Sequence, residues 1–295
     1  MLDSMTISSD FCYPSQFITV NGASMHYVEA GTGDPIVFVH GVPTSSYLWR
    51  NVIPHLTPYG RCIAVDLIGM GRSAKPDIEY RISDHIAYFE GFMETLGLTN
   101  VTLVLHAWGS VIGLDYAMRH SQKIKALAFM EAHLRPIHDW DMVALPVQEL
   151  TQILQQPDGG YDVIMNSDYY VDRVMSDGVM RRLTDQEMEH YRAPFPTPKS
   201  RLPIWQYLQE LPLGDDRQEA LNIIQAYSKK LEDSSLPKLL LYAVPGFITT
   251  MDTVHWAKQQ LPNLSMVDLG DALHYAQESK PHEFGEALAK WYNSI

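Results

Sequence analysis

Short apolar runs recur along the chain with the length and spacing of strands that are buried on both faces. Six runs have this pattern, at residues 36–40, 62–66, 101–106, 126–131, 238–242 and 265–269. Most are separated by stretches with helical spacing of apolar residues, at 82–96, 111–120, 253–261 and 283–292. Residues 16–30 alternate instead around Asn21-Gly22, which predicts a two-residue hairpin. Strands alternating with helices predict an α/β protein whose mostly parallel sheet carries helices on both faces.

One long segment breaks this alternation. Between about residue 133 and residue 213 we find no strand pattern, only helical stretches interrupted by Pro136, Pro157, Gly159-Gly160 and residues 194–198. We expect an inserted helical cap over the carboxyl ends of the strands, where open α/β sheets bind their ligands. The predicted division is a core domain of residues 1–132 and 214–295 and a cap domain of residues 133–213.

Composition narrows the class of protein. Of the 295 residues 46% are hydrophobic and 19% are charged, as in a globular protein with a sizeable core. The net charge of −13 argues against nucleic acid as a partner, because binding phosphates requires a basic surface. Cys12 and Cys62 have no paired spacing, so we expect two free thiols.

Targeting signals are not apparent in the sequence. We find neither a signal peptide nor an apolar run of membrane length, so we expect a cytoplasmic protein with no membrane partner. The first dozen residues are predicted to form a loose arm. No repeat, charged tail or exposed amphipathic helix indicates a protein-interaction module, and we expect a monomer.

The most informative segment is His106-Ala107-Trp108-Gly109-Ser110, which joins a predicted strand to a predicted helix. A strand, a sharp turn and a helix in this order form the nucleophile elbow of an α/β-hydrolase, which directs its central side chain into a pocket. That central residue is Ala107, whose methyl group cannot act as a nucleophile. We expect His106 to brace the elbow through a bond to the main chain.

Three further segments follow predicted strands at the same edge of the sheet. Val42 lies in the turn after the strand at 36–40, and its N–H and that of Trp108 could form an oxyanion hole. Glu131 ends the strand at 126–131, and His274 follows the last strand. The chain order of nucleophile position, acid and histidine is the order found in α/β-hydrolases.

Longer motifs resemble those of the haloalkane dehalogenases and their luciferase relatives. These motifs are HGVPTSSYLWR at 40–50, DLIGMGRS at 66–73, HAWGS at 106–110, LHY at 273–275, Met130-Glu131 with Arg135-Pro136, and YRAPF at 191–195. The resemblance covers nearly the whole chain after the first dozen residues. It implies an α/β-hydrolase fold with an eight-stranded sheet and a helical cap.

The resemblance also implies a two-step halide displacement. In this family an aspartate at the position of Ala107 attacks the carbon that bears the halogen, and water then cleaves the ester with the help of His274 and Glu131. The indole N–H of Trp108 and an asparagine at the position of Val42 hold the halide. The segment at the end of the next predicted strand, residues 242–246, contains no carboxylate that could serve as the acid in place of Glu131.

Two positions therefore depart from the family pattern. Ala107 removes the nucleophile, and Val42 removes a side-chain donor. Both changes run from polar to apolar within the site, which favours an engineered variant over natural decay. Val244 and Phe247 are two further apolar residues that could line the pocket.

The expected function follows from these departures. Dehalogenation should be abolished, because losing the nucleophile removes nearly all of the covalent route. His274 paired with Glu131 remains a competent general base for a Kemp-type proton abstraction or for hydrolysis of an activated ester. The alternative is a non-catalytic binder that holds a small hydrophobic ligand, or a halide ion, in the capped pocket. We expect neither a metal nor a cofactor.

Overall fold

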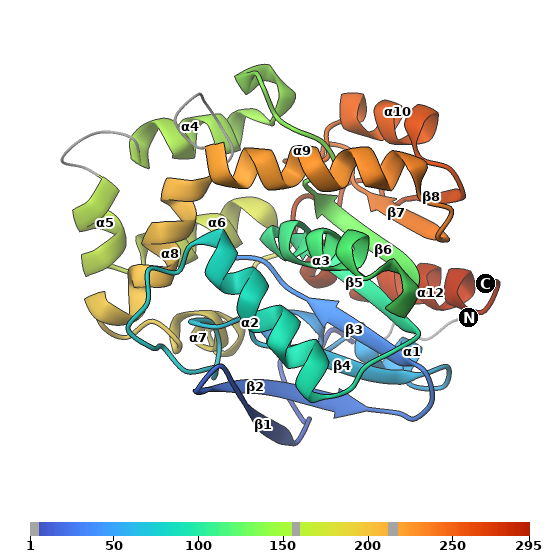
Figure 1. Cartoon of the computed structure of the whole chain (residues 1–295). Helices are drawn as coiled ribbons and strands as arrows, with labels where there is room; N and C mark the ends of the chain where they lie inside the picture. Colours follow the sequence, from blue (N-terminus) through green and yellow to red (C-terminus); the bar gives the residue numbers. More distant parts are fainter. Residues whose placement is uncertain (1–5, 155–159, 212–217) are drawn as a thin grey trace.

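A single sheet of eight strands forms the centre of the molecule, with helices on both of its faces (Figure 1). The computed structural model describes residues 6–154, 160–211 and 218–295. The order of strands across the sheet is β1-β2-β4-β3-β5-β6-β7-β8. Their bounds are β1 Ser15–Val20, β2 Ala23–Ala30, β3 Pro35–Val39, β4 Arg61–Val65, β5 Val101–Ala107, β6 Ile124–Ala132, β7 Lys238–Tyr242 and β8 Leu264–Asp268. All six predicted parallel strands are confirmed to within two residues.

The predicted hairpin is also confirmed. Strands β1 and β2 pair antiparallel, and Asn21 and Gly22 both have positive φ, 47° and 81°. This is the conformation that a two-residue hairpin turn requires. Strand β2 pairs antiparallel with β4, whereas all pairs from β4 to β8 are parallel.

Helices cover both faces of the sheet. On one face α2 (Ile82–Thr95) packs on α3 (Trp108–Arg119), which packs on α9 (Gln218–Asp233), and on the other face α1 (Ile53–Leu56) packs on α12 (Pro281–Tyr292) (Figure 1). The remaining core helices are α10 (Met251–Gln260) and α11 (Ala276–Ser279). The helix predicted at 111–120 begins three residues earlier, because Trp108 already follows the elbow turn.

The cap is helical, as predicted. Between β6 and β7, ahead of α9, lie α4 (Leu145–Leu154), α5 (Gly160–Asn166), α6 (Tyr169–Gly178), α7 (Asp185–Arg192) and α8 (Pro198–Glu210). These helices form a layer beyond the carboxyl ends of the strands (Figure 1). Pro157, Gly159 and the proposed boundary at 213/214 lie outside the described residues, so the division into 1–132, 133–213 and 214–295 stays a prediction.

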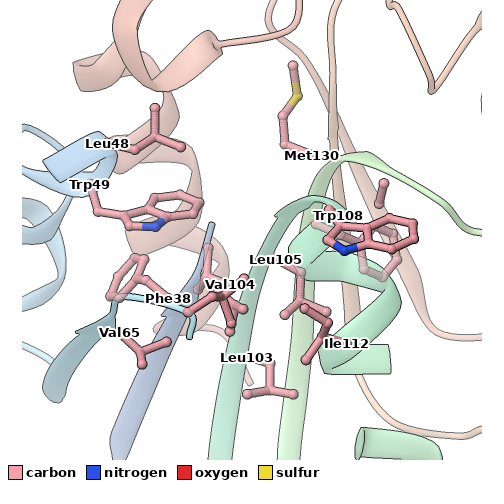
Figure 2. Packing of buried hydrophobic residues seen from close by; sticks show 14 of the residues in the cluster. Phe38, Leu48, Trp49, Val65, Leu103, Val104, Leu105, Trp108, Ile112 and Met130 are labelled. Atoms are coloured by element: carbon pink, nitrogen blue, oxygen red, sulfur yellow. The ribbon is translucent and has the colours of Figure 1, made fainter. Parts of the chain in front are cut away.

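Side chains from the central strands form the hydrophobic core. Figure 2 shows Phe38, Val65, Leu103 and Leu105 along neighbouring strands, and all four are buried. Trp49 packs on Phe38, with ring centroids 5.3 Å apart. This packing fixes the strand ends from which the candidate site residues project.

The amino-terminal arm is held in place over its described part. Arg50 donates from Nε to the carbonyl oxygen of Ser8 over 2.7 Å, and Tyr47 donates to the carbonyl oxygen of Ser9 over 2.7 Å. The prediction of a loose arm is therefore wrong for these residues. Their partners lie about forty positions away in the sequence, so the local pattern of the arm gives no sign of them.

Cys12 and Cys62 are both free, as predicted. Within the described residues no helix is long and apolar enough to cross a membrane.

Candidate active site

Ala107 occupies the predicted elbow between β5 and α3. Its φ of 47° and ψ of −125° lie outside the helical and strand regions, and the residue is 2% exposed. Ser110 donates from Oγ to the carbonyl oxygen of Ala107 over 2.6 Å, which stabilises the turn. A Cβ at Gly41 would lie 2.7 Å from the Cβ of Ala107. The glycine is needed because the loop after β3 passes this close to the elbow.

The predicted acid and histidine form a pair. His274 donates from Nδ1 to Oε2 of Glu131 over 2.7 Å, and Glu131 is fully buried at the end of β6. The same carboxylate accepts from the main-chain N–H groups of Phe247 and Ile248, each over 2.9 Å, and of Thr249 over 3.3 Å. These donors compensate the loss of hydration that burial imposes on the carboxylate.

A glycine makes this arrangement of donors possible. A Cβ at Gly246 would lie 2.3 Å from the carbonyl oxygen of Thr249 and 2.8 Å from Oε1 of Glu131. No real Cβ approaches main-chain atoms so closely, so the turn after β7 accepts only glycine here. Sequence reasoning did not find this residue, although Pro245-Gly246 is a recognisable turn signal.

The other ring nitrogen of His274 is available for chemistry. Within the described part of the chain no group hydrogen bonds with Nε2, and the residue is 7% exposed. The Phe247 ring stacks on the imidazole, with centroids 5.8 Å apart and planes inclined by 27°. His106 donates from Nε2 to the carbonyl oxygen of His274 over 2.9 Å, so it braces the loop that carries the histidine. Burial, and then the nearby His274, hold the pKa of His106 well below its usual value.

A cavity of about 80 Å³ lies between the strand ends and the cap. Val42, Phe247 and His274 are among its lining residues. The structure does not bring Val244 there: it is 42% exposed, and its N–H pairs with the carbonyl oxygen of Gly270. The lining also includes apolar side chains of the cap, such as Ile137, Val143, Val147, Leu150, Val174 and Leu211. The ion pair of Arg173 and Asp177 lines the cavity as well.

Trp108, the first residue of α3, lies at the inner end of the site. Figure 2 shows its indole at the right of the buried cluster, below Met130. The ring makes edge contacts with Tyr207 and His133, at centroid distances of 4.9 and 6.1 Å. Its Nε1 is buried and has no hydrogen-bond partner among the described residues. Ala107 and Trp108 are not among the residues that line the cavity.

His133 is a cavity residue that sequence reasoning missed. It lies two positions beyond Glu131, lines the cavity and is 3% exposed. Burial, with a smaller contribution from His274, lowers the pKa of His133 to about 3, so the ring is neutral at pH 7. Its position two residues after Glu131, just beyond the end of a predicted strand, was the sequence signal that could have identified it.

The strand order and the site geometry define the class of protein. An elbow between β5 and α3, with an acid and a histidine after later strands, is the arrangement of an α/β-hydrolase. Residues 34–281 match the family model described as alpha/beta hydrolase fold. The comparisons with individual proteins then identify the family.

The chain is similar to a haloalkane dehalogenase of Mesorhizobium japonicum, with 39% identity over 281 residues that cover 94% of this chain and 91% of the relative. A haloalkane dehalogenase of Bradyrhizobium diazoefficiens is 37% identical over 289 residues, with coverage of 94% and 93%. The chain belongs to the haloalkane dehalogenase family.

Solved structures agree with this assignment. The crystal structure of haloalkane dehalogenase DbeA from Bradyrhizobium elkani aligns with a TM-score of 0.92 at 34% identity, covering 95% of this chain and 98% of that one. DatA from Agrobacterium tumefaciens aligns with a TM-score of 0.90 at 34% identity, covering 95% and 96%. Coverage this complete extends the likeness to the helical cap.

Proposed function

We propose that this chain is a haloalkane dehalogenase scaffold that no longer cleaves carbon–halogen bonds and that uses His274 and Glu131 as a general-base pair. The observation that carries the proposal is the 2.7 Å hydrogen bond between the two residues, beside a cavity that His274 lines. The side chain of Ala107 offers no atom that could form a covalent intermediate. What the site retains is a proton acceptor next to an apolar space.

The base reaction follows from the hydrogen bonding of the pair. Glu131 accepts the proton on Nδ1 of His274, so the lone pair lies on Nε2. With a benzisoxazole in the cavity, Nε2 removes the proton from C3 while the C–H electrons form the nitrile and the N–O bond breaks. The oxygen leaves as a phenolate. Glu131 stabilises the imidazolium that results, because its carboxylate is already held in place.

The same base could drive water onto an activated ester. In that reaction Nε2 takes a proton from water while the oxygen attacks the carbonyl carbon, and the alcohol leaves with a proton returned by the imidazolium. The N–H groups of Val42 and Trp108 are the proposed oxyanion donors. An aryl ester is therefore the second substrate to test.

We also propose that Ala107 and Val42 were introduced deliberately. Ala107 keeps the elbow backbone that presents a nucleophile in α/β-hydrolases, although its side chain is a methyl group. The alternative function, a binder without turnover, has the same site residues but makes no use of the basicity of His274. We propose further that the protein is a cytoplasmic monomer. In this proposal it needs no cofactor or metal and takes a small hydrophobic substrate.

Turnover of 5-nitrobenzisoxazole and of 4-nitrophenyl acetate, followed by absorbance, tests the proposal. We expect His274→Ala to reduce kcat/KM by about 10²-fold or more, the usual contribution of a positioned base. The matched control is His190→Ala, which changes a half-buried histidine that does not line the cavity. Equal rates for the unsubstituted chain and His274→Ala would overturn the proposal and favour the binder.

A further inference from the structure

We propose that Ser15, His26 and Asp66 form a separate catalytic triad, in which activated esters acylate the hydroxyl of Ser15. The three residues are not among those that line the cavity beneath the cap. Ser15 belongs to β1, the outermost strand of the sheet (Figure 1), His26 to β2 and Asp66 to the loop after β4. The proposal does not rest on the proposed function, because it uses none of the residues of that site.

Two hydrogen bonds connect the three side chains in series. Nδ1 of His26 lies 2.8 Å from Oδ2 of Asp66, and Nε2 lies 3.0 Å from Oγ of Ser15. His26 is fully buried and Asp66 is 1% exposed, whereas Ser15 is exposed at the surface. A reachable hydroxyl, an imidazole and a buried carboxylate in this order have the roles of a serine hydrolase triad. Such triads are recognised by geometry rather than by fold or sequence position.

The groups around Asp66 determine where the proton of His26 lies. Oδ1 of Asp66 accepts from the main-chain N–H of Ser46 over 2.7 Å, and Oδ2 accepts from that of Arg72 over 2.8 Å. Burial by itself would raise the pKa of Asp66, but the hydrogen bonds that the carboxylate accepts, first that from His26, lower the pKa below its usual value. An ionised carboxylate can only accept, so Nδ1 of His26 carries a proton and the lone pair of the neutral ring lies on Nε2.

Arg72 fixes the orientation of the Ser15 hydroxyl. Its guanidinium donates from Nη1 to Oγ of Ser15 over 2.6 Å, and a guanidinium has no acceptor atom. Oγ therefore accepts from Arg72, and its own hydrogen is free to point at Nε2 of His26. Arg72 is exposed and forms no ion pair with a carboxylate of the described residues. Its positive charge can thus stabilise the oxyanion that forms when Ser15 attacks a carbonyl carbon.

The loop that supplies Asp66 and Arg72 is anchored to the main chain of His26. Oγ of Ser73 accepts from the N–H of His26 over 2.9 Å and donates to the carbonyl oxygen of Asp66 over 2.6 Å. The base and the acid are therefore held in position before any substrate arrives. The motif at 66–73 brings together the acid, the cation and this bridging serine, and the site beneath the cap uses none of them.

An exposed aromatic ring lies next to the triad. Phe17 is 58% exposed, and its ring centroid lies 5.1 Å from that of His26. Side chains two positions apart on a strand share a face, so Phe17 can contact an aromatic group of a substrate while Ser15 attacks the ester. Because Ser15 is exposed, water weakens the stabilisation that Arg72 provides. The substrates we expect are therefore aryl esters with a small acyl group and a good leaving group.

The reaction is an acyl transfer in two steps. Oγ of Ser15 bonds to the carbonyl carbon while Nε2 of His26 takes the hydroxyl proton, and the bond to the aryl oxygen breaks. The phenol leaves with the proton from His26, and an ester remains on Ser15. Water then attacks this ester and gives a proton to His26, and the bond to Oγ breaks as Oγ regains that proton. The products are a phenol and a carboxylic acid.

Peptide mapping by mass spectrometry tests the proposal, because general-base catalysis at His274 leaves no acyl group on a serine. The unsubstituted chain is treated at pH 8 with phenylmethylsulfonyl fluoride, which forms a stable sulfonyl ester as fluoride leaves and the serine proton passes through His26 to water. We expect Ser15 to be labelled about 10²-fold or more faster than Ser24, the usual contribution of a positioned base. Ser24 is the internal control, an exposed serine of the same hairpin whose hydroxyl has no hydrogen bond to a described residue.

An ester gives the second readout. After brief treatment with 4-nitrophenyl acetate and an acid quench, the acetyl group should be found on the peptide that contains Ser15. Equal labelling of Ser15 and Ser24 by the sulfonyl fluoride, or no acetyl group on Ser15, would overturn the proposal. Both readouts use the unsubstituted chain, so they do not depend on the folding of any variant.

Two variants separate the base from the cation. His26→Asn places an amide N–H where Nδ1 was, so it can keep the bond to Asp66 while it removes Nε2. We expect this variant to label Ser15 as slowly as Ser24. Arg72→Gln should slow the labelling by about 10-fold, less than the loss of a donor from a buried oxyanion hole. Ser24→Ala should leave it unchanged, and full labelling of Ser15 in folded His26→Asn would overturn the proposal.

Discussion

His106 and His274 are joined by a hydrogen bond from Nε2 of the first residue to the carbonyl oxygen of the second, over 2.9 Å. The residue before the elbow thus holds the loop that carries the proposed base. Their rings lie 4.8 Å apart between centroids. Because of this bond, changes at the elbow and changes at the base should not be independent.

Restoring the nucleophile should restore halide release. Ala107→Asp combined with Val42→Asn returns the carboxylate and the side-chain donor that the family uses, and the elbow backbone already has the conformation that presents them. We expect bromide release from 1-bromobutane to rise by about 10³-fold or more above background, because the nucleophile carries most of the covalent route. A halide electrode measures this release. Ala107→Asn with Val42→Asn is the matched control and should stay at background.

Glu131→Gln should impair the base without removing it. The amide oxygen would take the position of Oε2, because the N–H groups of Phe247 and Ile248 donate there, so Nδ1 of His274 keeps its acceptor. The imidazolium formed in the reaction would lose the negative charge that stabilises it. We expect kcat/KM for the benzisoxazole to fall by about 10²-fold or more, with KM less affected than kcat. Steady-state kinetics of the two proteins measure the split. A rate equal to that of the unsubstituted chain would show that the carboxylate is not needed.

Gly246→Ala should disturb the turn that supplies donors to Glu131. The added Cβ would lie 2.3 Å from the carbonyl oxygen of Thr249, so the main chain must move. We expect a loss of about 2–3 kcal/mol in the free energy of unfolding, together with weaker base activity. Gly97→Ala is the control: its φ is 62° but nothing lies within 4 Å, so only the backbone penalty of about 1 kcal/mol applies. Urea denaturation of both variants measures the difference.

The protein should become less stable as pH falls, because it contains buried neutral histidines. Burial lowers the pKa of His85 to about 4, whereas the unfolded chain has an ordinary histidine pKa near 6.5. Between these values the unfolded state binds the extra proton. The stability present above pH 6.5 is therefore lost as pH falls towards 4, by about 1.4 kcal/mol per unit for this residue. Urea denaturation at pH 7 and pH 5 should show a shallower dependence for His85→Leu. An identical pH dependence of stability for the two proteins would show that His85 does not contribute to it.

The fold could be predicted from the sequence because its signals are local. Apolar runs such as the one that became β5 define strands by composition, and Asn21-Gly22 defines a turn by its backbone preference. The elbow was recognisable because a strand, a turn and a helix follow one another without interruption around Ala107.

The finer structure of the site could not be predicted in this way. The three N–H groups that hold Glu131 come from residues more than a hundred positions later, and no periodicity connects the two segments. His133 is a single polar residue after a strand, and only the packing of the cap shows that it lines the cavity. Val244 is apolar, yet it is exposed, because hydrophobicity alone does not determine which way a loop residue points.

The conformation of Ala107 has a consequence for protein engineering. An L-residue with φ of 47° and ψ of −125° is strained, and a chain selected only for stability would relax it or place glycine there. Ser110, which donates to the carbonyl oxygen of Ala107, and Gly41, which lets the neighbouring loop approach, support this geometry without a reactive side chain at residue 107. Cysteine, serine or a synthetic amino acid introduced at this point would be delivered in the same orientation, so the reactivity of the protein can be exchanged without redesigning its backbone.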